Sequence, residues 1–309
     1  MLDCEINVCL ACDDNYARYA GVVIASILKN SESNDKIAIY LLDGGISQEN
    51  KMLLRKLSSI KDFDLNFIKI DEDLFKDYKS VKTHNYITLP TFYRLKLPTL
   101  LPDINKIIYF DCDFIVNSSL KELFNIDLQG YPLGGVHDIK EKMVRKNPTY
   151  VNAGMLVMDL AKFRELDLES AFLDWTKNHI DTIKVGDQEI INEVCKGKIA
   201  ILPKEWNVQS SNFTNRSCYT NKPKAIHFIA KKKPWHFASF SYHKGLYFKY
   251  LQLTPWAMGE EELKYWTTNG QIVSIFEYLK YRPIFFLRPK FYKAFFFTYI
   301  LPLFKGESL

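Results

Sequence analysis

The feature that most restricts the fold is an uninterrupted apolar run that ends abruptly in two acidic residues. Residues 106–116 read Lys-Ile-Ile-Tyr-Phe-Asp-Cys-Asp-Phe-Ile-Val. The four residues from Ile107 to Phe110 have no polar break, which is typical of a strand that is buried on both faces. Such a strand lies in the middle of a sheet that helices cover on both sides, so this run predicts an α/β fold.

Asp111 and Asp113 close the run, and the two-residue period of an extended chain turns both side chains to the same side. Open α/β sheets bind ligands at the carboxyl ends of their strands. Two carboxylates that face one way there repel each other unless a cation lies between them, and a divalent metal is the usual cation. In the alternative interpretation one carboxylate caps a helix and the other is solvated, and the motif by itself leaves both open.

The N-terminal part alternates strand and helix patterns. We predict strands over residues 6–12, 37–42 and 65–70, separated by helices of which the second begins at Ser47. This order predicts βαβ units and a parallel sheet of the nucleotide-binding type. The sequence lacks both Gly-x-Gly-x-x-Gly and a P-loop. A nucleotide would therefore be held at its base or ribose by residues 13–15 and at its phosphates by a metal on the acidic pair.

Weaker patterns continue the chain toward the C-terminus. We predict strands over residues 133–137, 155–158 and 199–202, and a helix around residues 161–177. Gly186 and Asp187 open a further helix that runs through Cys195. Asp187 fits the N-cap of that helix as well as it fits a catalytic role.

A second stretch of interest is residues 225–235, Ala-Ile-His-Phe-Ile-Ala-Lys-Lys-Lys-Pro-Trp. His227 falls in a short apolar strand, where a histidine is usually a hydrogen-bonded core residue. Here three lysines follow it closely, so an imidazole that binds a metal would be joined to an ammonium that neutralises phosphate. Asp111, Asp113 and His227 with a nearby lysine form a coherent set for a metal-bound diphosphate.

Taken together, the chain resembles the family 8 retaining glycosyltransferases, in particular the bacterial lipopolysaccharide α-galactosyl- and α-glucosyltransferases. The likeness covers nearly the whole chain. It is carried, in this order, by residues 11–16 (Ala-Cys-Asp-Asp-Asn-Tyr), 93–97 (Tyr-Arg-Leu-Lys-Leu), 109–113 (Tyr-Phe-Asp-Cys-Asp), 151–154 (Val-Asn-Ala-Gly), 186–188 (Gly-Asp-Gln), 206–207 (Trp-Asn) and 227–235.

The resemblance implies a single Rossmann-like nucleotide-sugar-binding domain of the GT-A type, with UDP-galactose or UDP-glucose as donor. It implies Mn²⁺ as the metal, with Mg²⁺ as the alternative, bound by Asp111, Asp113 and His227. The remaining roles that it implies are uridine contact by Ala11, Asp13 and Asn15, sugar contact by Arg94, Asn152, Asp138, Asp187 and Gln188, and neutralisation of the departing phosphate by Lys233.

Two positions depart from the family pattern. Ala230 replaces a glycine of the family's His-x-x-Gly-x-x-Lys-Pro-Trp segment, and its methyl group is a small obstacle to the diphosphate. Tyr86 stands where the family often has a histidine, so the role of that histidine does not transfer. A catalytic carboxylate is absent at the position of Gln188, and an amide is a poor nucleophile. We therefore expect transfer on one face of the sugar through an oxocarbenium-like ion pair, supported by Gln188 and Asp187.

The C-terminal segment is basic and aromatic. From residue 280 to 305 there are six basic residues and no acidic one, and the longest uncharged run is the eleven residues 294–304. This run is shorter than the roughly twenty residues that span a bilayer. The segment suits an anionic headgroup surface, although the aromatics could instead pack on the catalytic domain. We predict a catalytic domain over residues 1–255 and a helical, membrane-attaching region over residues 256–309.

The expected location and partners follow from these predictions. We expect a cytoplasmic protein, because the first fifteen residues do not form a secretory signal, and one attached to the inner face of the bacterial inner membrane beside a lipid-linked oligosaccharide acceptor. A capsular glycan or a glycoprotein is the alternative acceptor, and a non-catalytic carbohydrate-binding protein is the alternative class. A phosphatase of the haloacid dehalogenase type would have the acidic pair near its N-terminus and no use for the segment after His227. The basic residues form no recognisable nucleic-acid module.

Overall fold

The computed structural model describes residues 5–79, 81, 89–210, 222–229, 233–236, 239, 241, 243–269, 289, 292 and 296. Tyr86, Ala230 and most of the predicted membrane-attaching region, residues 256–309, lie outside these residues. The boundary at residues 255–256 therefore stays a prediction. Within the described ranges, no helix combines the length and the apolar character that crossing a membrane requires.

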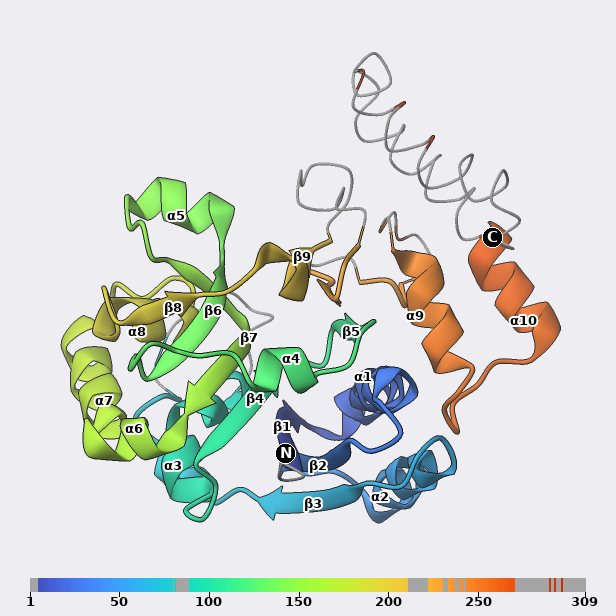
Figure 1. Cartoon of the computed structure of the whole chain (residues 1–309), viewed down its shortest axis with the longest axis horizontal. Helices are drawn as coiled ribbons and strands as arrows, with labels where there is room; N and C mark the ends of the chain where they lie inside the picture. The colour runs from blue at the N-terminus through green and yellow to red at the C-terminus, as the bar shows by residue number, and fades with distance from the viewer. Residues whose placement is uncertain are drawn as a thin grey trace.

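A seven-stranded sheet forms the centre of the molecule (Figure 1), in the order β3-β2-β1-β4-β7-β6-β8. Its strands are β1 (Glu5–Cys12), β2 (Lys36–Asp43), β3 (Asp64–Lys69), β4 (Lys106–Phe110), β6 (Leu133–His137), β7 (Val151–Asp159) and β8 (Ile199–Ile201). The pairs β1–β2, β2–β3, β1–β4 and β6–β8 are parallel, whereas β7 runs antiparallel to both β4 and β6. The α/β class is confirmed, and so is the parallel pairing predicted for the N-terminal strands, whereas β7 makes the sheet as a whole mixed.

Helices lie on both faces of this sheet. One apolar cluster joins the sheet to α1 (Ala17–Asn30), α2 (Gln48–Arg55) and α4 (Lys121–Phe124), and another joins it to α3 (Leu97–Leu100), α6 (Leu160–Glu165), α7 (Leu168–His179) and α8 (Asp187–Val194). The other α-helices are α5 (Ile139–Arg145), α9 (Lys244–Leu251) and α10 (Glu260–Lys264). This three-layer arrangement is the one that an alternating strand and helix pattern predicts.

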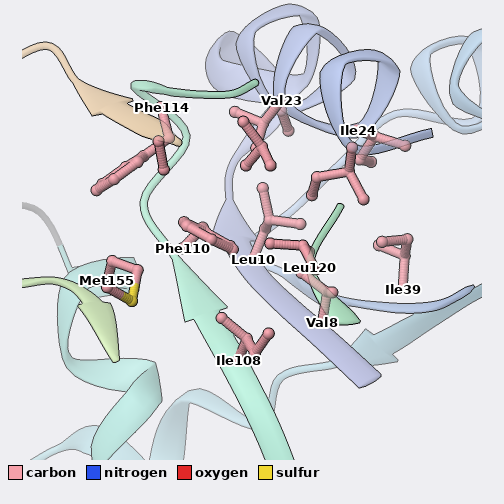
Figure 2. Close-up of a cluster of buried hydrophobic side chains, with 14 of the residues drawn as sticks. Val8, Leu10, Val23, Ile24, Ile39, Ile108, Phe110, Phe114, Leu120 and Met155 are labelled. Atoms are coloured by element: carbon pink, nitrogen blue, oxygen red, sulfur yellow. The ribbon is translucent and has the colours of Figure 1, made fainter. Parts of the chain in front are cut away.

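Alternation along the strands divides the core between the two faces. Figure 2 shows the first cluster, where Val8 and Leu10 from β1 approach Ile108 and Phe110 from β4 beneath α1. The intervening residues, such as Cys9, belong to the cluster on the other face. Cys9 and Cys12 therefore pack in different clusters and remain free, buried thiols.

A second, three-stranded sheet has the order β5-β10-β9, with β5 (Phe114–Val116), β9 (Val208–Gln209) and β10 (Ala225–His227). Phe114 pairs with His227 in the antiparallel pair of β5 and β10. The chain thus leaves the large sheet at the end of β4, turns through the acidic pair and enters the small sheet beside His227. This junction places residues from distant parts of the sequence at one point.

Three local predictions need correction. The helix predicted around residues 161–177 is broken between α6 and α7, where Asp167 adopts a φ of 45°. The N-cap of α8 is Gly186, with a φ of 66°, so the prediction that Asp187 caps this helix is wrong and Asp187 is its first residue. Strand β7 begins at Val151, four residues earlier than predicted, which places Asn152 inside the sheet.

Candidate active site

The two acidic residues and His227 meet at the junction of the two sheets. His227 Nε2 lies 3.1 Å from Asp113 Oδ1 and 4.0 Å from Asp111 Oδ2. Backbone hydrogen bonds fix the junction, because Asp111 N donates to Gly154 O at 2.8 Å and Phe228 N donates to Asp113 O at 2.9 Å. The prediction that these three side chains converge is confirmed.

The three residues form a donor set that fits a divalent metal. One ligand atom from each lies within 4.8 Å of the other two. Ligands that are each about 2.1 Å from one ion, and at least 90° apart around it, lie about 3 to 4 Å from each other, which matches the two distances from His227. Asp113 Oδ1 is buried and lies 3.1 Å from His227 Nε2, so a cation bound between these two atoms would be held by both.

Glycine at position 154 makes room for this cluster. A Cβ atom built on Gly154 would lie 2.3 Å from His227 Cε1 and 2.9 Å from Asp111 Oδ2. Both approaches are far closer than van der Waals contact. The backbone of β7 therefore forms one wall of the candidate metal site, and only glycine fits there.

Two cations hold the remaining oxygens of the acidic pair. Arg94 Nη2 lies 2.6 Å from Asp111 Oδ1, and Lys233 Nζ lies 2.5 Å from Asp113 Oδ2. Burial raises the pKa of the Asp113 carboxyl, but the charges of Lys233 and His227 outweigh it and hold that pKa below its usual value. Asp113 is thus ionised, as a metal ligand must be.

Arg94 connects the acidic pair to helix α8. The residue is 2% exposed, and its guanidinium lies 4.0 Å from the centroid of the Tyr109 ring, with Nε 3.0 Å from Asp187 Oδ2. Its Nη1 also donates to Ala153 O at 2.5 Å. Burial alone would lower the pKa of this guanidinium, but the carboxylates of Asp111 and Asp187 raise it. Contact between Arg94 and a sugar stays a prediction.

Asp187 carries an unusual pKa for a carboxyl group. Burial raises this pKa to about 6, against the opposing charge of Arg94 and with the added repulsion of Asp111. The side chain is fixed at the first position of α8, whose N-cap Gly186 offers no side chain to bond the first helical amides. The carboxyl therefore lies where a helix terminus and an arginine both favour negative charge.

Gln188 follows Asp187 in α8, and hydrogen bonds hold both ends of its side-chain amide. Its Oε1 accepts from Ala153 N and from Asn152 Nδ2, each at 3.1 Å, and its Nε2 donates to Asp138 Oδ2 at 3.3 Å. The backbone donor at Ala153 fixes which end of the amide is the oxygen. Asp138 is at the same time the N-cap of α5, where its Oδ1 accepts from Glu141 N at 3.1 Å. All five predicted sugar-contacting residues thus form one group, because Arg94 bonds both the carbonyl oxygen of Ala153 and the carboxyl group of Asp187.

The residues that the resemblance assigns to uridine lie at the end of β1. Ala11 is half-buried beside the acidic pair, since Cys112 Sγ approaches its carbonyl oxygen at 3.3 Å. Asp13 is half-buried and caps the next turn by accepting from Tyr16 N at 3.1 Å, and Asn15 is exposed. Among the described residues, no hydrogen bond or ion pair joins Asp13 or Asn15 to the Asp-Asp-His cluster. Their contact with a nucleotide stays a prediction.

Some features of the site have no counterpart in the sequence predictions. Trp235 stacks on Tyr19, with ring centroids 3.9 Å apart, and Tyr16 meets both rings edge-on. This aromatic group joins the segment after Lys233 to the start of α1. Asn207 donates to Asn152 Oδ1 at 2.9 Å deep in the site. The Trp-Asn pair at residues 206–207 was a motif of the resemblance but carried no role.

The chain is similar to several known proteins. A protein of Haemophilus influenzae whose name places it only among the glycosyltransferases is 33% identical over 245 residues, which are 75% of this chain and 73% of that protein. The lipopolysaccharide 1,2-glucosyltransferase of Escherichia coli is 26% identical over 275 residues, covering 81% of this chain and 79% of the relative. The galactosyltransferase LgtC, solved in complex with donor and acceptor sugar analogs, superposes with a TM-score of 0.71 at 25% identity and covers 83% of this chain and 98% of its own.

The model of one family spans most of the described catalytic region. It is the glycosyl transferase family 8 model, and it matches residues 7–239. This range contains both sheets except the first two residues of β1, together with the acidic pair, α8 and the segment from His227 to Trp235. The chain is a glycosyltransferase with the GT-A type of fold, and it belongs to glycosyl transferase family 8.

Proposed function

We propose that this protein is a metal-dependent retaining α-glycosyltransferase that moves glucose or galactose from a UDP-sugar to a lipopolysaccharide or lipooligosaccharide core. The observation that carries the proposal is the convergence of Asp111 Oδ2, Asp113 Oδ1 and His227 Nε2, with the ammonium of Lys233 beside them. A diphosphate that leaves a sugar needs positive charge at this point, and the chain supplies both a metal site and a lysine there.

The donor's diphosphate would lie between the metal-binding residues and Lys233. Asp111, Asp113 and His227 would hold Mn²⁺ or Mg²⁺, which supplies Lewis-acid stabilisation of the leaving phosphate oxygens. Lys233 lies on the rim of the cluster, 17% exposed at its side chain, and would exchange part of its contact with Asp113 for a phosphate oxygen. That exchange would strengthen as negative charge develops on the leaving group, so it lowers the barrier rather than only improving binding.

The proposed route keeps the new bond on the same face of the sugar. Gln188 is a poor nucleophile because its amide oxygen already accepts two hydrogen bonds and faces β7. Asp187 is 3% exposed and paired with Arg94, which restrains it as a nucleophile. The two side chains would orient and support an oxocarbenium-like sugar while the leaving phosphate oxygen takes the acceptor's proton. Mass spectrometry that trapped a glycosyl adduct on Asp187 or Gln188 would overturn this route.

The acceptor and the location are proposed from a relative and from the composition of the C-terminal segment. The named function of the Escherichia coli relative supports a lipopolysaccharide acceptor, and the basic aromatic composition of residues 280–305 supports attachment to the inner face of the inner membrane. We propose that the protein binds the lipid-linked acceptor while it is attached to the anionic membrane surface. A capsular glycan or a glycoprotein would require the same donor chemistry, so only the acceptor separates these alternatives.

The first experiment measures UDP release and transfer from a panel of UDP-sugars, with Mn²⁺ or with chelator, for the wild type and Asp113→Ala. Metal-dependent release from UDP-glucose or UDP-galactose that disappears in the variant would support the proposal and name the donor. A parallel series with core oligosaccharide, capsular glycan and glycoprotein acceptors separates the acceptor classes. Sugar binding without release, unaffected by chelator, would favour a non-catalytic carbohydrate-binding protein instead.

A further inference from the structure

Helix α5, which stands beyond the end of β6 (Figure 1), has no apolar anchor among its described side chains. Asp138, its N-cap, reaches Gln188 Nε2 at 3.3 Å, so the helix begins at the proposed sugar site. The side chains of residues 141–145 belong to none of the three apolar clusters, and Met143 and Val144 are 75% and 69% exposed. A helix without a buried apolar face depends on polar contacts for its position.

The other end of α5 is joined to the next residue of α8. Arg145 Nη1 lies 2.8 Å from Glu189 Oε1, and Glu189 directly follows Gln188 in the chain. The guanidinium is also oriented by Glu141, whose Oε2 lies 3.2 Å from Arg145 Nε, and by the Tyr150 ring, whose centroid lies 5.5 Å away. Two bridges thus connect α5 to α8, one at each end of α5.

Glu189 also holds the chain that leads into α8. Its Oε2 accepts from Lys184 N at 2.8 Å and from Val185 N at 3.1 Å, directly before the N-cap Gly186. Burial raises the pKa of the Glu189 carboxyl, but hydrogen bonds from Arg145 and from the two backbone amides outweigh it and lower that pKa. One ionised carboxylate therefore holds α5 with one oxygen and the start of α8 with the other.

We propose that Arg145 and Glu189 are positioning residues, whose ion pair holds α5 against α8 and so keeps Asp138 within hydrogen-bonding distance of Gln188. The inference rests on the transferase function proposed above. Neither residue of the pair needs to touch the sugar for this role. Loss of the pair leaves α5 joined to α8 by the bridge at its N-cap, and the residues that would contact the sugar lose their fixed spacing. A misplacement of about 1 Å in such a group can lower the rate about 100-fold.

The first measurement compares the transfer kinetics of Arg145→Gln and Glu189→Gln with those of the wild type. We expect kcat to fall about 10- to 100-fold in each, while KM for the UDP-sugar stays within about threefold, because the metal-binding residues are untouched. The double variant is expected to lose no more than either single variant, since all three remove one interaction. Arg145→Lys keeps a cation and is expected to recover most of kcat. Arg164→Gln is the matched control, because Arg164 also bonds across elements, to Ile104 O and Asn105 Oδ1, at the end of β4 opposite the acidic pair.

The second measurement needs no turnover. It follows hydrogen exchange of the backbone amides of residues 141–145 and the side-chain ¹H–¹⁵N signals of Gln188, which are assigned by their absence in Gln188→Met. Arg145→Gln is expected to speed this exchange about 10-fold and to shift the Gln188 signals, with neither change in Arg164→Gln. Unchanged kcat in both single variants, a loss confined to KM, or additive losses in the double variant would overturn the inference. A wild type that turns over no UDP-sugar, while exchange and the Gln188 signals respond as expected, would instead overturn the transferase function proposed above.

Discussion

The carboxylates that follow the N-terminal strands and those that follow β4 differ in the partners that hold them. Asp14 Oδ1 accepts from Ser47 N at 2.7 Å, and Asp43 Oδ1 accepts from Ile46 N at 2.6 Å, although Asp43 Oδ2 also lies 2.5 Å from Lys51 Nζ. Asp111 and Asp113 are held instead by the side chains of Arg94 and Lys233. Backbone donors are fixed by the fold, whereas a lysine can move to another anion. Aspartates after the N-terminal strands therefore stabilise turns. Asp111 and Asp113 after β4 instead form a charge cluster whose lysine can bind another anion.

The largest difference between these two sets of carboxylates is expected in the transfer rate, when one residue of each set is substituted. Asp113→Asn removes a charge that faces Lys233 and His227, and we expect the transfer rate to fall more than about 100-fold. Asp14→Asn keeps an acceptor for Ser47 N and Asn50 Nδ2, so its rate is expected to stay within about threefold of the wild type. Steady-state kinetics at saturating metal measure both. Equal losses in the two variants would abolish the distinction between turn-forming and charge-cluster carboxylates.

The next effect concerns the wall that β7 provides. Gly154→Ala would bring a methyl group against the His227 ring, and we expect unfolding free energy to fall by about 1 to 3 kcal/mol and transfer to fall about 10- to 100-fold. Gly245→Ala is the control, because an added Cβ there meets nothing within 4 Å. Chemical denaturation and kinetics are compared for the two variants. A fully active Gly154→Ala would mean that the cluster repacks without loss.

A third effect distinguishes the two buried acids by the direction of their pH dependence. Burial raises the pKa of Asp187 from 3.8 to about 6, so the folded chain holds this proton more tightly than the unfolded chain does. Its contribution to stability is present at low pH and is lost as the pH rises from 3.8 to about 6. We expect the wild type to lose about 2 kcal/mol relative to Asp187→Asn between about pH 4.5 and pH 7.

The pKa of Asp113 is shifted the other way, since Lys233 and His227 overcome the effect of burial. Its contribution is present above the unfolded pKa and is lost only as the pH falls below it. Over the same pH interval, the metal-free wild type should therefore lose no stability relative to metal-free Asp113→Asn. Parallel denaturation curves for both variants at the two pH values make the comparison. If the stability difference between wild type and variant changed equally with pH for Asp113→Asn and for Asp187→Asn, that result would contradict the opposite environments assigned to these two acids.

Periodicity predicted the half of the fold whose contacts are local. The strands over residues 6–12, 37–42 and 65–70 appear as β1, β2 and β3, and Ser47 caps α2 as expected. Each signal lies within a few residues, because alternation and capping act along one stretch of chain. The convergence of Asp111, Asp113 and His227 was also predicted, through the resemblance and the chemistry of the donor set.

The rest of the site depends on contacts between distant residues, and no local pattern encodes them. Asn152 meets His227 across 75 positions and Asn207 across 55. The direction of β7 follows from its pairing with both β4 and β6, and the need for glycine at position 154 follows only from the His227 ring that packs against it. Arg94 looked like a sugar-binding residue, but only the folded chain shows it buried between Asp111 and Asp187.

The smallest expected effect tests whether the N-terminal half can be weakened without touching the chemistry. Ser47→Ala removes the hydroxyl that accepts from Asn50 N at 3.2 Å, and we expect a stability loss of about 1 kcal/mol with an unchanged transfer rate. Ser58→Ala is the control, since Ser58 is exposed and lies in the turn that follows α2. Thermal unfolding and transfer assays are run on both. A drop in transfer that accompanies the loss of this cap would mean that α2 helps to hold the end of β1 in its active form, because Asp14 bonds both Ser47 N and the Asn50 side chain.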